Sequence, residues 1–199
     1  MSRVRDIVAL VKPRITLMVV ATGVVGLYLA PQTPSSETKL GLLIGMSLLV
    51  GGANALNMYL ERDIDGRAER TKNRPLPAGR LEPSVALSLG LSLGVLAMLW
   101  LAVVVNLLTA GLGLLAFVAY TAVYTPMKQY SPGALVVGAV PGAMPPLMGW
   151  TAATGQLDLA GLTLFAIMFL WQLPHFIAIA IFRGDDYRRA GFKTLVSEL

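Results

Sequence analysis

Residues 40–80 read LGLLIGMSLLVGGANALNMYLERDIDGRAERTKNRPLPAGR, a long apolar run that passes directly into a densely charged stretch. The first half, 40–60, has no charged residue and is about 20 residues long, enough for a helix to cross a hydrocarbon core. In lipid the backbone must satisfy its own hydrogen bonds, so a helix is the structure expected for such a run. We therefore predict a membrane-spanning helix that ends at a charged surface.

Five more apolar runs of similar length accompany this one. They are 15–30, 85–105, 107–124, 134–153 and 159–182. None shows the period-two alternation of a barrel strand. Charged residues make up 14% of the chain, against roughly a quarter in an average soluble domain. The sequence predicts an all-α fold, a polytopic membrane helix bundle of about six spans.

Positive charge gathers on alternate connections between these runs. Fifteen of the sixteen Lys and Arg residues lie in the N-terminus, in 62–80, at Lys128 or in 183–193, and only Lys39 does not. The positive-inside rule places these basic segments in the cytoplasm, which explains the net charge of +5 without nucleic acid. No long Arg/Ser-rich presequence precedes the first run. We therefore expect a multi-pass protein of the bacterial cytoplasmic (inner) membrane, with its N-terminus in the cytoplasm.

The charged stretch begins with a repeat of polar residues. Asn57, Glu61 and Asp65 are spaced by four, which puts them on one face of a helix, and Asn54 joins the same face. Carboxylate and amide oxygens suit Mg²⁺, which takes one or two carboxylates and completes its shell with waters and substrate phosphates. Asp63 points away from this face unless the helix loosens just after it. The pattern predicts a magnesium site that is completed by a phosphate group.

Basic residues follow the acidic ones directly. Arg70, Lys72 and Arg74 lie close to a Pro-Leu-Pro turn. Arg offers fork-shaped donors to phosphate and Lys offers a point charge. A loop that is basic only for topology would also carry such residues, but it would not need carboxylates aligned on the end of a span, where their burial is costly. We therefore favour a phosphate-binding role.

A second acidic pair, Asp185 and Asp186, ends the sixth run on the same side of the membrane. Two acid-plus-basic clusters could hold opposite sides of one Mg²⁺-diphosphate, whereas the simpler interpretation is an ordinary capped helix end. His175, the only histidine, shares a helix face with Asp186. It is either a hydrogen-bonded packing residue or a contact for substrate or iron.

Two further features have alternative interpretations. Tyr124 lies near the cytoplasmic end of the fourth run, where it is either an interfacial anchor or a π-face that stabilises a carbocation. The stretch 138–150 contains three prolines and three glycines. Such a helix is expected to kink or unwind, which is tolerated at membrane depth where the backbone lines a cavity. We predict a central cavity beside this stretch.

These motifs together resemble the UbiA-type intramembrane prenyltransferase superfamily, whose pattern N-x-x-x-[DE]-x-x-x-D matches Asn57, Glu61 and Asp65. The resemblance is strongest to the heme O synthase branch and covers nearly the whole chain. The matching motifs are E-x-D-x-D-x-x-x-x-R-T-x-x-R-P-L-P-x-G-R at 61–80, YTPMK at 124–128, G-A-x-P-P-L-x-G-W at 142–150, P-H-F at 174–176 and D-Y-x-x-A-G at 186–191.

The resemblance implies a nine-span fold around a central cavity, of which this chain would hold about six spans as a single, C-terminally truncated prenyltransferase domain over 1–199. It implies transfer of the farnesyl group of farnesyl diphosphate to the vinyl group of heme B, giving heme O for terminal oxidase biogenesis. Mg²⁺ would accompany the diphosphate, and heme B would be a substrate rather than a prosthetic group. The implied partners are these substrates, the lipid bilayer, and a heme A synthase or oxidase assembly factor.

The resemblance also assigns roles to residues. The catalytic residues are Asn57, Glu61, Asp65, Asp185 and Asp186, and the metal ligands are Asn57, Glu61, Asp65 and Asp186. The diphosphate-binding residues are Arg70, Lys72, Arg74 and Lys128. His175 and Tyr124 are candidates for contact with heme or the cavity. No side-chain nucleophile is required, which agrees with the absence of cysteine.

Two alternatives to this activity stay open. One is a related prenyltransferase that acts on an aromatic acid or a quinone precursor. The other is a non-catalytic membrane protein that handles heme or transports a solute, although the sequence shows no convincing inverted repeat of the kind found in many transporters.

Overall fold

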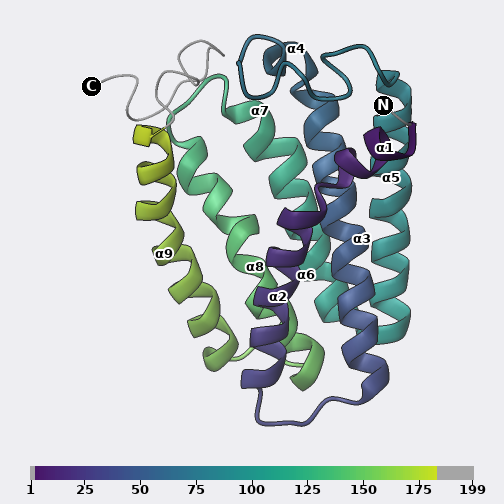
Figure 1. The fold of residues 1–199 in the computed structure, drawn as a ribbon. Coiled ribbons are helices and arrows are strands. Elements are labelled where there is room, and N and C mark those ends of the chain that lie inside the picture. Colours follow the sequence, from purple (N-terminus) through teal and green to yellow (C-terminus); the bar gives the residue numbers. More distant parts are fainter. Residues whose placement is uncertain (1–2, 183–199) are drawn as a thin grey trace.

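The computed structural model describes residues 3–182, and every regular element in that range is a helix (Figure 1). Six helical segments are long and apolar enough to cross a membrane. The first is Arg3–Leu29, which comprises α1 (Arg3–Val11) and α2 (Pro13–Leu29). The others are α3 (Ser36–Leu60), α5 (Pro83–Trp100) continued by the π-helix η1 (Leu101–Val105), α6 (Leu107–Val118) continued by the π-helix η2 (Ala119–Tyr124) and α7 (Thr125–Met127), α8 (Ala134–Thr154) and α9 (Leu159–Phe182). The prediction of an all-α membrane bundle is confirmed, with helix ends within a few residues of the predicted runs.

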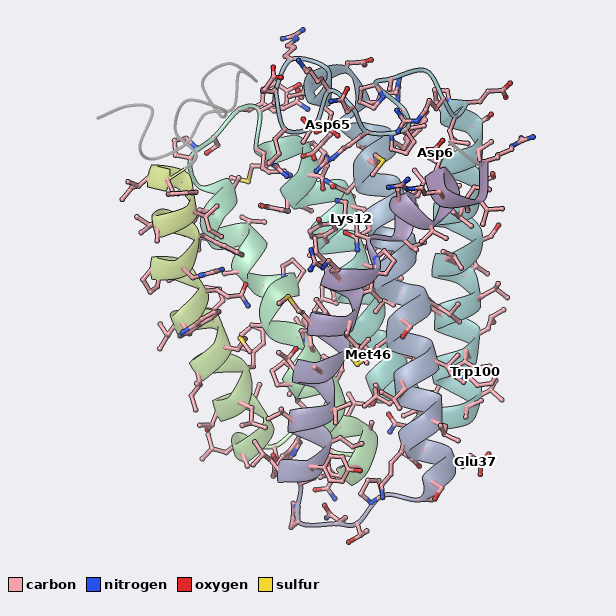
Figure 2. All side chains as sticks on the ribbon, viewed as in Figure 1. Asp6, Lys12, Glu37, Met46, Asp65 and Trp100 are labelled. Atoms are coloured by element: carbon pink, nitrogen blue, oxygen red, sulfur yellow. The ribbon has the colours of Figure 1, made fainter. Side chains whose placement is uncertain are left out.

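Two short helices lie at one end of the bundle. α1 (Arg3–Val11) precedes α2, and α4 (Arg62–Asp65) follows α3. Figure 2 shows Asp6 and Asp65 at this end and Glu37 at the other. We call it the basic end, because it carries the N-terminal segment and the Arg-rich loop 66–82.

The core lies between α3 and α8, the two most buried spans. α8 packs against α2, α6 and α9, while α3 packs against α5, α2 and α1. Side chains such as Leu42, Met46, Leu101 and Met148 fill the centre. Large apolar side chains remain exposed on the outer faces, Leu17 and Val103 among them. An apolar exterior is what a bundle surrounded by lipid requires.

The proline-rich helix decides between two predicted outcomes, a kink and an unwound segment. α8 contains Pro141, Pro145 and Pro146, yet it is continuous from Ala134 to Thr154, so the stretch does not unwind. Proline removes a backbone donor but keeps a helical φ. The helix is also held by close packing on α2: a Cβ at Gly149 would overlap the backbone carbonyl oxygen of Gly23. Packing of this kind provides part of the stabilisation that the missing backbone hydrogen bonds would otherwise give to α8.

At the opposite end of the bundle, a buried polar network links α6 to α8. Asn106 Oδ1 accepts from the Thr109 N–H at 2.8 Å and caps α6, while its Nδ2 donates to the Thr151 carbonyl of α8 at 3.0 Å. Thr109 and Thr151 are fully buried, and their hydroxyls lie 2.9 Å apart. One side chain thus caps one helix and ties it to another.

Replacing Asn106 with alanine is expected to destabilise the protein by about 1–2 kcal/mol, because it removes a helix cap and a hydrogen bond to α8. Thermal unfolding in detergent measures the change. Ser35→Ala is the matched control, since Ser35 also caps a helix but is exposed, and its side-chain hydrogen bonds within residues 3–182 are to Thr38 of the same helix. An equal loss of stability in both variants would contradict the role of the link to α8.

Candidate functional site

Three polar residues of the α3–α4 segment are buried at the basic end. Asn57, Glu61 and Asp65 are only 2%, 4% and 4% exposed. α3 ends just before Glu61, but the helical spacing continues, because the Glu61 N–H donates to Asn57 O and the Asp65 N–H donates to Glu61 O. Asp63, by contrast, has a side chain that is 80% exposed and lies beside Arg62. The helix therefore keeps Asn57, Glu61 and Asp65 together and turns Asp63 outward.

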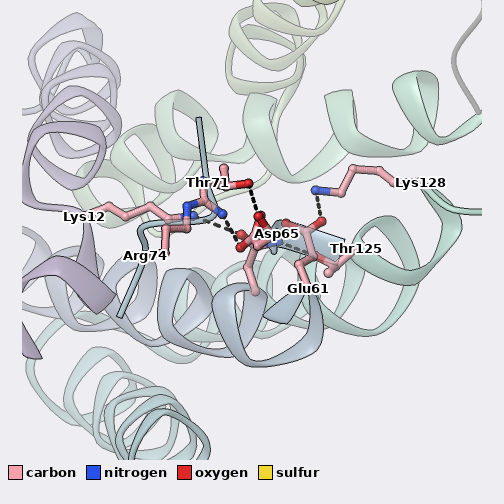
Figure 3. Close-up of polar contacts among 8 residues, drawn as sticks. Lys12, Glu61, Asp65, Thr71, Arg74, Thr125 and Lys128 are labelled. Carbon is pink, nitrogen blue, oxygen red and sulfur yellow. Dashed lines mark hydrogen bonds and ion pairs between the residues drawn. The ribbon is translucent and has the colours of Figure 1, made fainter. Parts of the chain in front are cut away.

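Each of the three residues is bonded to a different basic side chain (Figure 3). Lys12 Nζ donates to Asn57 Oδ1 at 3.0 Å, Lys128 Nζ forms an ion pair with Glu61 Oε1, and Arg74 Nη1 lies 2.5 Å from Asp65 Oδ2. The basic side chains come from the α1–α2 corner, the segment after α7 and the loop after α4. We call these six residues the polar cluster: Lys12, Asn57, Glu61, Asp65, Arg74 and Lys128.

Two buried threonines orient the cluster. Thr125 Oγ1 accepts from Asn57 Nδ2 at 3.3 Å and donates to the Tyr120 carbonyl at 2.8 Å. This turns the amide oxygen of Asn57 toward Lys12.

Two further features lie beside the cluster. Tyr120 belongs to η2, and a π-helical turn within a helix is often found at a functional site. Thr71 Oγ1 donates to the Asp65 carbonyl at 2.8 Å and fixes the loop against α4.

The neighbours of Lys128 change the pKa of its ammonium group. Burial alone lowers the pKa of its ammonium group, but Tyr124 and Glu61 more than offset this, and the pKa of Lys128 lies above its usual value. Its Nζ also lies 4.8 Å from the centroid of the Tyr124 ring. That ring fills the space that a Cβ on Gly138 of α8 would occupy. Lys128 therefore stays protonated at neutral pH, and Tyr124 borders the polar cluster.

Comparison with known families identifies the family of this chain. The sequence profile of the UbiA prenyltransferase family matches residues 19–199. This chain belongs to the UbiA prenyltransferase family. It is 53% identical over 189 residues to the protoheme IX farnesyltransferase of Anaeromyxobacter sp. (strain Fw109-5), and 51% identical over 193 residues to that of Myxococcus xanthus (strain DK1622). The matched regions cover 95% and 97% of this chain but 64% and 66% of those relatives, so the chain spans about two thirds of their length.

Solved structures of the UbiA family share the fold. A UbiA homolog from Archaeoglobus fulgidus, bound to DMAPP and Mg²⁺, superposes with a TM-score of 0.83 at 17% identity, over 95% of this chain and 67% of that one. The apo structure of a UbiA homolog from Aeropyrum pernix K1 superposes with a TM-score of 0.80 at 20% identity, over 94% of this chain and 70% of that one.

The donor set of the polar cluster has the chemistry of a magnesium site. Glu61, Asp65 and Asn57 offer two carboxylates and one amide oxygen, which are hard ligands of the kind and number that Mg²⁺ uses when a phosphate supplies the rest. Among residues 3–182 there is no group of three or more His, Cys, Asp or Glu that could hold a metal alone. The cluster therefore suits a metal that arrives with an anionic ligand.

Other predicted site residues lie elsewhere or outside the structure. Arg70 is exposed, and Lys72 is exposed and pairs with Glu69 at 2.6 Å. His175 is exposed on α9, where its ring stacks on Trp171 with centroids 4.8 Å apart. The predicted residues Asp185 and Asp186 lie outside the described residues.

Sequence reasoning missed Lys12, Thr71 and Thr125 as members of the site. In the sequence Lys12 is one of several basic residues of the N-terminus, which the positive-inside rule explains as a group. Its position immediately before Pro13, between an amphipathic segment and the first span, is the one sequence signal that sets it apart from them.

Proposed function

We propose that this chain transfers the farnesyl group of farnesyl diphosphate to the vinyl group of heme B and forms heme O. The observation that carries the proposal is the polar cluster, in which Glu61 and Asp65 are buried beside three basic side chains at one end of a membrane bundle. Relatives at 53% and 51% identity carry the name protoheme IX farnesyltransferase, which supports this donor and acceptor.

The chain's own residues have separable roles. Glu61, Asp65 and the amide oxygen of Asn57 would hold Mg²⁺, and Asp185 and Asp186 are proposed as further acidic residues for the same Mg²⁺-diphosphate. Mg²⁺ supplies charge neutralisation of the diphosphate leaving group. Arg74 and Lys128 bind phosphate oxygens from the two flanks of the acids, and Arg70 and Lys72 extend this positive surface. Such fixed charges stabilise the negative charge that develops on the leaving group.

The reaction balances without a protein nucleophile. The bond between C1 of the farnesyl group and the diphosphate oxygen breaks, and the electron pair leaves with the diphosphate. The π electrons of the heme vinyl group then form a new carbon–carbon bond to C1. Water adds to the resulting cation and loses a proton, which completes the hydroxyethylfarnesyl arm. In this proposal the ring face of Tyr124 stabilises the allylic cation, and His175 contacts heme.

The setting of the reaction is part of the proposal. The positive-inside rule puts the basic end, and with it the polar cluster, on the cytoplasmic side of a bacterial inner membrane. The prenyl chain of the donor is apolar and its diphosphate is charged, so both parts fit a site where a membrane bundle meets a basic surface. A heme A synthase or an oxidase assembly factor would receive the product.

A purified-protein assay tests the proposal. The chain is incubated with farnesyl diphosphate and either heme B or 4-hydroxybenzoate, with Mg²⁺ or with a chelator, and products are separated by chromatography and mass spectrometry. We expect heme O with heme B and Mg²⁺, and no product with the chelator. Prenylation of 4-hydroxybenzoate alone would replace the heme assignment with that of a sister enzyme.

A further inference from the structure

Lys12 is the least expected member of the polar cluster. It lies between α1 and α2 with φ 46° and ψ 68°, and it is the one non-glycine residue with a positive φ in the described part of the chain. A left-handed backbone is costly for a residue with a side chain. Strain of this kind persists where the surrounding structure enforces it, often at a functional site.

The side chain of Lys12 is directed inward. A lysine near the end of a membrane helix ordinarily extends its ammonium toward water. Lys12 instead places its Nζ on the amide oxygen of Asn57, which is 2% exposed. In this partly buried position the ammonium group is hydrogen-bonded to a neutral acceptor and not to a carboxylate.

The charges of the polar cluster do not balance within residues 3–182. Arg74 and Lys128 each have a carboxylate partner, Asp65 and Glu61 respectively. The side chain of Lys12 forms no ion pair with any residue in that range, and its one hydrogen bond there is the bond to Asn57. Three basic side chains thus share two carboxylates. An excess positive charge in a partly buried site favours binding of an anion.

Packing fixes the position from which Lys12 reaches the cluster. α1 is anchored by Leu10, which is fully buried against Ala55 and Met58 of α3. It is also anchored by Asp6, which is 5% exposed and accepts from Arg80 Nε at 3.0 Å. Figure 3 shows Lys12 and Lys128 on opposite sides of the acidic residues. The two ammonium groups could therefore hold a ligand from both sides.

We propose that Lys12 is a diphosphate-binding residue, and that it exchanges Asn57 Oδ1 for a phosphate oxygen when the prenyl diphosphate binds with Mg²⁺. This role rests on the proposed function. Asn57 holds the ammonium group in place before the substrate arrives, so little side-chain freedom is lost on binding. The exchange also frees the amide oxygen of Asn57 as a metal ligand.

Replacing Lys12 with methionine tests this role, with farnesyl thiodiphosphate and Mg²⁺ as the binding probe for the purified full chain. Methionine keeps the length of the side chain and removes its charge. We expect Kd for the probe to rise about 10- to 100-fold, the range for loss of one hydrogen bond to a charged group. We expect the Tm of the probe-free protein to change little, because removal of an uncompensated charge offsets the loss of the hydrogen bond to Asn57.

Three further variants make the test decisive. Lys12→Arg should restore binding to within a few fold of the wild type, whereas Lys12→Gln, which can still donate a hydrogen bond but carries no charge, should not. Lys39→Met, at the opposite end of the bundle beside Tyr28, should bind as the wild type does.

The possible failures are distinguishable. Wild-type binding by Lys12→Met or Lys12→Gln would overturn the role of Lys12 alone. A fall in the Tm of the probe-free Lys12→Met protein, with Kd unchanged, would assign Lys12 a structural role instead. A wild-type chain that does not bind the probe would overturn the proposed function as well.

Discussion

Replacing Glu61 with glutamine is expected to lower the rate of prenyl transfer by about 100- to 1,000-fold, as for loss of one preorganised electrostatic contact to a transition state. Glu61 is buried and ion-paired with Lys128. Glutamine keeps the size of the side chain but removes the charge that would hold Mg²⁺ and place Lys128. The initial rate of heme O formation with farnesyl diphosphate and heme B measures the effect.

Asp63 provides the matched control for this experiment. It is two residues from Glu61 in the same acidic motif, but its side chain is 80% exposed and lies beside Arg62. Asp63→Asn should therefore retain most of the activity. If the Glu61→Gln chain supported normal heme O accumulation in a cell that lacks its own synthase, Glu61 would have no place in the diphosphate site.

The second large effect is expected at Gly149, where α8 meets α2. A Cβ at this position would overlap the Gly23 carbonyl oxygen and lie 2.6 Å from the Leu27 backbone nitrogen. Both are backbone atoms, so neither can move aside by changing a rotamer. Gly149→Ala should therefore destabilise the bundle by about 3 kcal/mol, the upper end of the usual cost of overpacking, and lower Tm by roughly 6–12 °C.

Gly111 is the control for this prediction. It lies in α6 with no atom within 4 Å of a built Cβ. Alanine is a better helix former than glycine, so Gly111→Ala should leave Tm unchanged or raise it. Thermal unfolding of both variants in the same detergent makes the comparison. Equal melting temperatures would show that α2 and α8 do not approach as closely as described.

The spans could be predicted from sequence because insertion into lipid depends on local hydropathy. The runs that define α3 and α9 needed no knowledge of their neighbours. The placement of Asn57, Glu61 and Asp65 together is also local, since a four-residue spacing fixes the face of a helix. The three residues stay on one face beyond the end of α3, because the Asp65 N–H still donates to Glu61 O.

The features that could not be predicted from sequence depend on tertiary contacts. Lys12 and Asn57 are 45 residues apart, and Asn57 and Thr125 are 68 apart, so no local pattern joins them. Likewise Arg74 and Lys72 are the same kind of residue in one loop, but the fold of the loop turns Arg74 onto Asp65 and leaves Lys72 outside. The continuity of α8 through three prolines depends on its packing against α2 in the same way.

The ion pair between Asp6 and Arg80 has a consequence for the biosynthesis of the chain. The two residues are separated by 74 positions, so the ribosome makes Asp6 long before its partner. Until Arg80 has been synthesised, α1 lacks the ion pair that ties it to the loop after α4. The site around Lys12 is therefore assembled only after the loop beyond the second span has emerged and closed back onto the start of the protein.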